Sequence, residues 1–343
     1  MNASNSAWRQ QLLVIITLLL SVATLTPFCL NAAQVHPFSV TNTSPVILVQ
    51  GLPNSRNPEI TEKGDVAFGL DYEITSHFAH EDSSDELLLF DGETTRVMLS
   101  LKTGLTHGVE VELQIPYISN DGGFLDSFII DWHNFFGLPQ NGRDQVPNNQ
   151  LDYFYEKNGV TQLDFQEPAS GVGDVQLIFA FNANQNRPAK QNNLAFKTAI
   201  KFPTGDSTKL TGSGAHAISG WLAGDMRYRW LSKQGLTYYN LGAMWLPDGD
   251  ILQDQQRFWV WFGGIGSGVK VSERIVLQIQ LDTNSPFYNS SNFVEINSYA
   301  LQLTIGGNVK FSNNWNLDIG VVEDLIVHAS PDVIFHFRLN GLF

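Results

Sequence analysis

Hydrophobic and polar residues alternate in one segment after another from Gly64 to the end of the chain. A period of two is typical of β-strands that have one apolar and one polar face. About 12 of these segments have the length that a tilted membrane-spanning strand needs. Their apolar faces are predicted within residues 66–74, 97–101, 109–115, 175–181, 194–202, 222–230, 239–245, 258–262, 275–281, 301–309, 317–321 and 333–339. The pattern favours an all-β fold, a transmembrane antiparallel up-and-down β-barrel, although a soluble β-sandwich or lipocalin-like barrel has the same period.

The connections between the predicted strands favour the membrane barrel. Counted back from a periplasmic C-terminus, short turns alternate with long connections, as in bacterial outer-membrane barrels. The polar connection at 183–193 is longer than the other periplasmic turns. Predicted extracellular connections lie at 77–93, 116–171, 203–215, 246–256, 283–296 and 324–331.

Aromatic residues are predicted to gather at both ends of the strands, as expected where a barrel meets the two membrane interfaces. The periplasmic set is Phe181, Tyr228, Trp230, Tyr239, Phe311, Trp315 and Phe343. The outer set is Tyr117, Phe202, Trp245, Phe258 and Tyr299.

The first 33 residues have the features of a secretory signal peptide. Arg9 is their only charged side chain, an apolar core follows it, and small residues precede a cleavage site near Ala33. A membrane anchor is the alternative, but the apolar core is shorter than the roughly 20 residues of a spanning helix. We therefore predict a signal peptide at 1–33, a periplasmic N-terminal segment at 34–63 and a barrel at 64–343.

Composition excludes several classes of function. The formal net charge is −14, which makes nucleic acid an improbable partner. Cys29 is the one cysteine and lies in the predicted signal peptide, so the exported chain has no disulfide, catalytic thiol or cysteine-ligated metal. No cofactor motif is recognised and no metal site is predicted. The expected partners are outer-membrane lipids and the outer-membrane assembly machinery.

Charged residues at inward positions define the predicted lumen. Acidic side chains come from the early strands and basic ones mainly from the middle and the end of the wall. The acidic set is Asp71, Glu73, Glu110, Glu112 and Asp174, and the basic set is Lys197, Lys201, Arg227, Arg229 and Arg338. Two opposed arcs would place a transverse field across a pore. The alternative is a set of cross-strand ion pairs around an occluded lumen.

The insertion at 116–171 is too long for a simple loop. Apolar residues recur in it at helical spacing, at Leu125, Phe128, Ile129, Trp132 and Phe136. They predict a short amphipathic helix. One hypothesis is that this helix plugs the barrel mouth by docking on inward Trp221, Trp259 and Trp261. The other is that it lies over the outer rim or packs loops together.

Phe343 ends an alternating strand, which resembles the C-terminal assembly signal of outer-membrane barrels, although Gly341 stands where that signal usually has an aromatic residue.

Three stretches together resemble a family of bacterial proteins called domain of unknown function 3187. They are Gln50 to Pro58, Gly108 to Pro116, and Gly122 to Leu138 followed by Arg143. The resemblance covers nearly all of the chain after the signal peptide. It implies an outer-membrane barrel and no particular activity.

These observations predict a porin-like channel or uptake protein for a small solute of unknown identity. A structural or interaction barrel with a sealed lumen is the first alternative. A lipid-modifying enzyme is the second, because Asp126, Ser127 and His133 provide the residue types of an acyl-transfer site, although their spacing does not support one.

Overall fold

The computed structural model describes residues 33–54, 57–137, 140, 142–183, 193–230, 233–326 and 329–343. The predicted signal peptide falls almost entirely outside these residues, as do 184–192 of the long periplasmic turn and the side chains of Phe136 and Trp230. The strands are β1 (Val66–Asp82), β2 (Glu86–Thr106), β3 (Val109–Asp121), β4 (Asp152–Lys157), β5 (Val160–Phe165), β6 (Ala169–Val172), β7 (Val175–Asn182), β8 (Leu194–Phe202), β9 (Ala217–Trp230), β10 (Lys233–Trp245), β11 (Trp259–Lys270), β12 (Ile275–Asn284), β13 (Ala300–Lys310), β14 (Trp315–Asp324) and β15 (Val333–Leu342). The helices are α2 (Pro45–Leu48), α3 (Asp126–Phe136) and the 3-10 turns η1 (Arg143–Gln145), η2 (Ser207–Lys209) and η3 (Gln253–Gln255).

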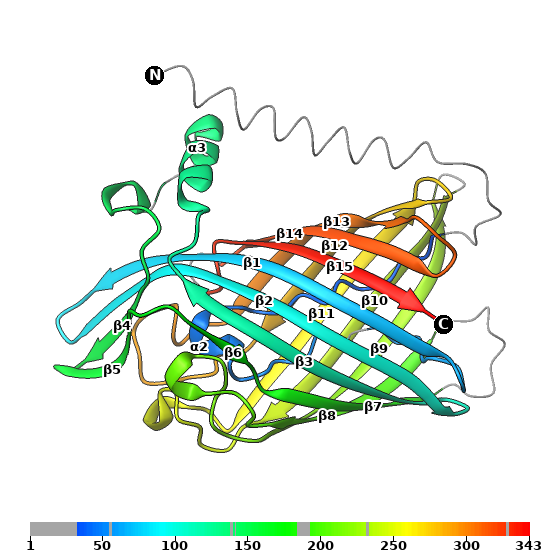
Figure 1. The fold of residues 1–343 in the computed structure, drawn as a ribbon, viewed down its shortest axis with the longest axis horizontal. Helices are drawn as coiled ribbons and strands as arrows, with labels where there is room; N and C mark the ends of the chain where they lie inside the picture. The colour runs from blue at the N-terminus through cyan, green and yellow to red at the C-terminus, as the bar shows by residue number, and fades with distance from the viewer. Residues whose placement is uncertain are drawn as a thin grey trace.

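Twelve antiparallel strands among the described residues form a closed barrel (Figure 1). Each strand pairs with the next in the order β1, β2, β3, then β7 to β15, and β15 pairs with β1. At the seam Leu70 lies opposite Leu339, and the backbones of Val66 and Phe343 exchange hydrogen bonds of 2.8 and 2.9 Å. Closure leaves no unpaired edge in the wall, as a membrane-spanning sheet requires.

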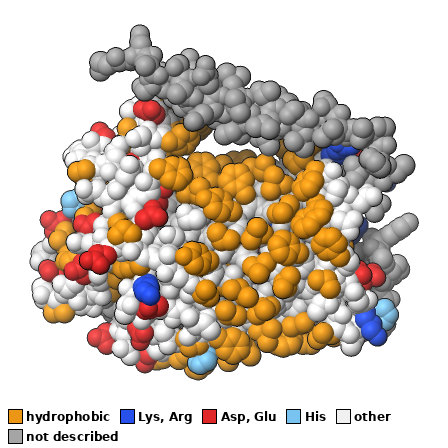
Figure 2. Space-filling model, viewed as in Figure 1, with side chains coloured by type: hydrophobic (Ala, Val, Ile, Leu, Met, Phe, Trp, Pro, Cys, Tyr) orange, Lys and Arg blue, Asp and Glu red, His pale blue; other side chains and the backbone are white. Residues whose placement is uncertain are grey.

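The outer face of the wall is an apolar belt (Figure 2). Its side chains include Leu241, Leu277 and Ile305, which are 65%, 57% and 57% exposed. Such exposure would be unfavourable in water but suits contact with lipid. Aromatic side chains at the rims, such as Phe311 and Tyr299, are also exposed. A closed antiparallel barrel with this belt is the architecture of bacterial outer-membrane proteins, and this chain lies in that membrane.

One strand has its faces opposite to those predicted. In β11, Val260 and Phe262 are buried inside the barrel, whereas Trp259 and Trp261 are 66% and 42% exposed on the outside. Residues 258–262 are all apolar, so alternation alone does not show which face is inward. Pairing decides it, because Trp259 lies opposite the outward Trp245 of β10.

The extracellular side contains more β-strand than the sequence predicted. The predicted connection at 77–93 is largely strand, because β1 and β2 continue beyond the wall as a hairpin that turns at 83–85. Within the insertion at 116–171, β4 pairs with the start of β2, β5 pairs with β4, and β6 pairs with the end of β3. Among the described residues no helix is long and apolar enough to cross a membrane.

The end of β15 explains the glycine in the predicted assembly signal. A side chain at Gly341 would collide with Trp315, which lies opposite it on β14 and would be 2.8 Å from a Cβ atom. The Trp315 ring instead packs edge-on against Phe343 at 5.3 Å and against Phe68 at 6.0 Å. The aromatic surface at this rim is therefore supplied by the neighbouring strand. Recognition of Phe343 by the assembly machinery stays a prediction.

Candidate functional site

The N-terminal segment lies inside the barrel, not in the periplasm as predicted for 34–63. It begins at the periplasmic end, where the Ala33 N–H donates to the carbonyl of Glu273 in the β11–β12 turn. It then runs through the lumen to α2 and returns, so that Lys63 pairs with Gly104 near the periplasmic end of β2 (Figure 1). Residues 37–50 are all buried. We call residues 37–54 the lumen segment.

Side chains of the barrel wall bind the part of the lumen segment that precedes α2. The Phe38 N–H donates to Gln280 Oε1 at 2.9 Å, and Gln280 Nε2 donates back to the Phe38 carbonyl at 3.3 Å. Ser39 donates to Asp71, and the hydroxyls of Thr43 and Thr75 lie 3.0 Å apart. Side chains of the wall thereby satisfy the backbone N–H and carbonyl of Phe38 and the hydroxyls of Ser39 and Thr43.

The returning part of the lumen segment is held on the opposite wall. Lys201 Nζ donates to the Val49 carbonyl at 3.2 Å, and Gln176 Nε2 donates to the Gly51 carbonyl at 3.1 Å. Lys201 also pairs with Asp174 at 2.5 Å, so this lysine joins the segment to the wall.

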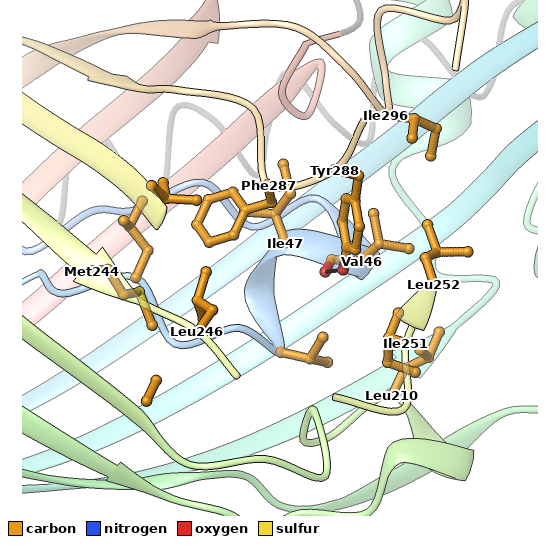
Figure 3. Close-up of a cluster of buried hydrophobic side chains, with 14 of the residues drawn as sticks. Val46, Ile47, Leu210, Met244, Leu246, Ile251, Leu252, Phe287, Tyr288 and Ile296 are labelled. Carbon is orange, nitrogen blue, oxygen red and sulfur yellow. Dashed lines mark hydrogen bonds between the residues drawn. The ribbon is translucent and has the colours of Figure 1, made fainter. Parts of the chain in front are cut away.

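An apolar core surrounds α2 near the extracellular mouth (Figure 3). Pro45 stands in the first turn of α2, where its missing N–H has no helical partner to lose. Val46 and Ile47 are 0% and 5% exposed and pack among apolar side chains of the extracellular loops, including Leu210, Leu246, Ile251, Leu252, Phe287 and Tyr288. Burial of each such side chain contributes about 1.5–3 kcal/mol.

Tyr288 links this core to the backbone of α2. Its hydroxyl donates to the Val46 carbonyl at 2.7 Å and accepts a hydrogen bond from Gln50 Nε2 at 2.8 Å. The mouth is thus closed by an apolar core, and the lumen on its periplasmic side is crossed by the hydrogen-bonded lumen segment. A cavity of about 20 Å³ lies between the segment and the wall, beside Arg96, Gln114 and Gln176. That volume holds about one water molecule.

Most of the predicted lumen charges form ion pairs across the barrel wall. Asp71 lies opposite Arg338 in the strand register, and their side chains are 2.9 Å apart. Glu73 contacts Arg96 at 2.6 Å and His336 at 3.0 Å. Barrel closure makes the last strand a neighbour of the first, so charges distant in sequence meet. The two opposed arcs therefore do not form between these groups.

The remaining predicted lumen charges fall into two groups. Lys197 and Glu110 are buried 3.9 Å apart, and Glu112 meets Lys102 at 3.3 Å. Arg227 and Arg229 are instead exposed near the periplasmic end of β9. Trp221 is buried on the inner face as predicted, with its ring 6.1 Å from that of Phe262.

The helix of the insertion lies outside the lumen. Leu125 and Ile129 pack against Val333 of β15, and Trp259 and Trp261 face away from the lumen. The hypothesis that α3 docks on Trp221, Trp259 and Trp261 is therefore wrong, and the alternative position at the outer rim is correct. The apolar core at the mouth is occupied by α2, and the lumen beyond it is lined by charge pairs, so neither offers α3 an apolar surface.

Two of the residues considered for acyl transfer, Asp126 and Ser127, make contacts within the insertion. Asp126 pairs with Arg143 and accepts from the Asn149 N–H, and Ser127 accepts from Asn148 Nδ2 at 3.0 Å. These contacts fasten the loop after α3 and do not direct a base toward a nucleophile.

The position of the lumen segment inside the barrel was not predicted, although one feature of the sequence agrees with it. Residues 33–54 contain no Asp, Glu, Lys or Arg, in a chain that is 16% charged. Small hydroxyl and amide residues followed by an apolar run suit a path past ion pairs and into an apolar core.

The chain belongs to the family described as "Protein of unknown function (DUF3187)", whose model matches residues 13–343. Among curated proteins none matches this sequence.

Solved structures support the fold of this family member. It is similar to the COG4313 outer membrane channel from Pseudomonas putida F1, with 14% identity, a TM-score of 0.53, and coverage of 85% of this chain and 99% of that chain. At this identity the likeness concerns the fold alone. The transport unit of the autotransporter AIDA-I from Escherichia coli is also similar, at 11% identity, with coverage of 88% of this chain and 97% of that chain and a TM-score of 0.44.

Proposed function

We propose that this protein is an outer-membrane channel for a small polar solute and that the lumen segment closes it. The observation that carries the proposal is the burial of residues 37–50 inside a twelve-stranded barrel. A barrel of about eight strands is filled by its own side chains, and wider barrels leave space for a channel or a plug. The lumen segment occupies that space.

The way the segment is held supports a removable plug. Its contacts with the wall run mainly through side chains such as Gln280, Thr75 and Lys201. Among the described residues of the N-terminal region, the bridge to the wall is made by Lys63, outside the lumen segment, with Gly104. A neutral hydrogen bond of this kind contributes a net of about 0.5–1.5 kcal/mol, and one from the charged Lys201 contributes about 1.5–3 kcal/mol. The segment can leave without breaking any hydrogen bond between barrel strands.

The wall left behind would suit a polar solute. Groups that now bind the segment include Asp71, Gln176, Lys201 and Gln280, so both signs of charge and amide groups would face the opened lumen. The similarity to a solved outer-membrane channel is consistent with this role.

Deletion of residues 37–54 tests the proposal in planar lipid bilayers. The native protein should show rare openings, and the deletion variant should show a sustained current. Heat-modifiable migration in gels checks that the variant has folded. A second variant, Val46→Asp with Ile47→Asp, should expel α2 from its apolar core and raise the opening rate while all residues are retained.

The alternative is a barrel with a permanently sealed lumen, acting in structure or interaction. The ion pairs of Asp71, Glu73 and Lys201 favour it, because they hold neighbouring strands together regardless of the segment. Folded variants of both kinds that carry no current would support this alternative and overturn the channel.

A further inference from the structure

Helix α3 is attached to the outside of the barrel wall. Leu125 and Ile129 are 7% and 4% exposed and pack with Val333 and the half-buried Ile74 and Phe335. Ile74 and Phe335 stand at outward positions of β1 and β15, opposite each other in the strand register. The helix therefore begins where the apolar belt ends.

Several contacts fix α3 at this place. Glu93 on β2 accepts hydrogen bonds from the backbone N–H groups of Phe124 and Leu125, at 2.8 Å for Phe124, before the first helical turn. Arg143 pairs with Asp126 on the helix and with Asp332 beside β15. In Figure 1, α3 projects sideways from the extracellular rim, with its axis across the direction of the strands. It thus extends along the membrane surface, away from the lumen.

Four aromatic side chains of this region are exposed. Phe124, Phe128, Trp132 and Phe135 are 64%, 42%, 48% and 78% exposed. The Phe128 ring lies 6.1 Å from Phe335 of the wall and 6.1 Å from Trp132, so the aromatic surface continues from the belt onto the helix.

The other side of α3 is polar. Asn134 accepts a hydrogen bond from Gln140, and Ser127 accepts one from Asn148. Trp132 and Asn134 are two residues apart, which places them on nearly opposite sides of a helix that turns about 100° per residue. The helix is thus divided lengthwise into an aromatic side and a polar side.

We propose that α3 is an interfacial helix whose aromatic side inserts into the boundary between headgroups and acyl chains of the outer leaflet. Continuity with the lipid-facing wall identifies the occupant, because a lipid chain that covers Phe335 reaches Phe128 and Trp132 next. Aromatic rings, and tryptophan above all, prefer this boundary. Amphipathic helices bind there through their apolar side.

Site-specific quenching by lipid tests this inference. In the full chain with Cys29→Ser, the chain has no other cysteine, so Trp132→Cys and Asn134→Cys each accept a single bimane label. Leu241→Cys on the lipid-facing wall is the positive control. The folded variants are placed in phosphatidylcholine vesicles with ordinary acyl chains or with acyl chains brominated near the headgroup.

Brominated lipid should lower the fluorescence of the label at 132 by about twofold or more and leave the label at 134 nearly unchanged. Aqueous iodide should quench the label at 134 more strongly than the label at 132. Equal quenching of both labels by iodide, with no effect of bromine, would place the helix in water and overturn the proposal. A label at 132 shielded from both quenchers would show a protein partner or a second copy on this side, and would overturn it as well.

Discussion

The lumen segment and helix α3 differ in where they lie relative to the barrel wall, because the segment is inside the barrel and the helix is outside it. Residues 34–63 were predicted to be periplasmic, yet residues 37–54 fill the barrel. The helix near Leu125 to Phe136 was predicted to be able to plug the mouth, yet it packs on the outside of the wall. An amphipathic helix requires a boundary between an apolar and a polar phase. A lumen lined with ion pairs instead accepts a chain whose polar groups match it one by one.

Locking the lumen segment to the wall should have the largest effect. The hydroxyls of Thr43 and Thr75 are 3.0 Å apart, so Thr43→Cys with Thr75→Cys, in a Cys29→Ser background, should form a disulfide. The oxidised protein should show no openings in planar bilayers, and reduction should restore them. The single Thr43→Cys variant is the control. Equal currents before and after reduction, with the disulfide verified by thiol labelling, would contradict closure by this segment.

Loss of one anchor should have a smaller effect. Lys201→Met removes the hydrogen bond to the Val49 carbonyl and the ion pair with Asp174. Since loss of hydrogen bonds to a charged group costs about 1.5–3 kcal/mol, openings should become about tenfold or more frequent. Lys157→Met is the matched control, because Lys157 pairs with Glu86 on the extracellular hairpin. A similar change in both variants would show general destabilisation and not release of the plug.

The loop above α2 should respond to pH. Burial, together with the nearby carboxylates of Glu81 and Asp324, raises the pKa of Glu295 from an ordinary 4.5 to about 7. The same loop carries Phe287 and Tyr288, which pack around α2. A raised carboxyl pKa favours the protonated form in the folded state. The added stability is complete below the unfolded value of 4.5 and is lost as pH rises toward 7.

Limited proteolysis measures this dependence. Residues 285–299 of the native protein should be cleaved faster at about pH 8 than at about pH 5.5, and Glu295→Gln should make the two rates nearly equal. A Glu295→Gln protein that keeps the full pH dependence would assign the effect to other groups.

Removal of α3 should leave the channel unchanged. Deletion of residues 126–136 should alter neither the conductance nor the opening rate, because the helix packs on the outer wall and not in the lumen. The same deletion should have no further effect when residues 37–54 are also absent. An increase in current in either background would restore a gating role to the helix.

Most of the wall was predictable from sequence because each strand has one face toward lipid. Alternation correctly gave outward positions such as Leu241 and Ile305 and inward positions such as Asp71 and Trp221. It failed in β11, where apolar residues occupy both faces of the outer end. There the inner face packs against the apolar core around α2, which depends on a segment about 200 residues earlier in the chain.

The sequence by itself determined the barrel, its outward belt and the residues available to its lumen, because the two-residue period of a strand is a local property. Only the tertiary structure decided which charges meet and what fills the lumen. Arg338 reaches Asp71 because the barrel closes, and Lys201 reaches the Val49 carbonyl because the N-terminal segment enters the lumen. Both contacts join residues far apart in the chain. A local sequence pattern cannot predict which of these distant residues will meet.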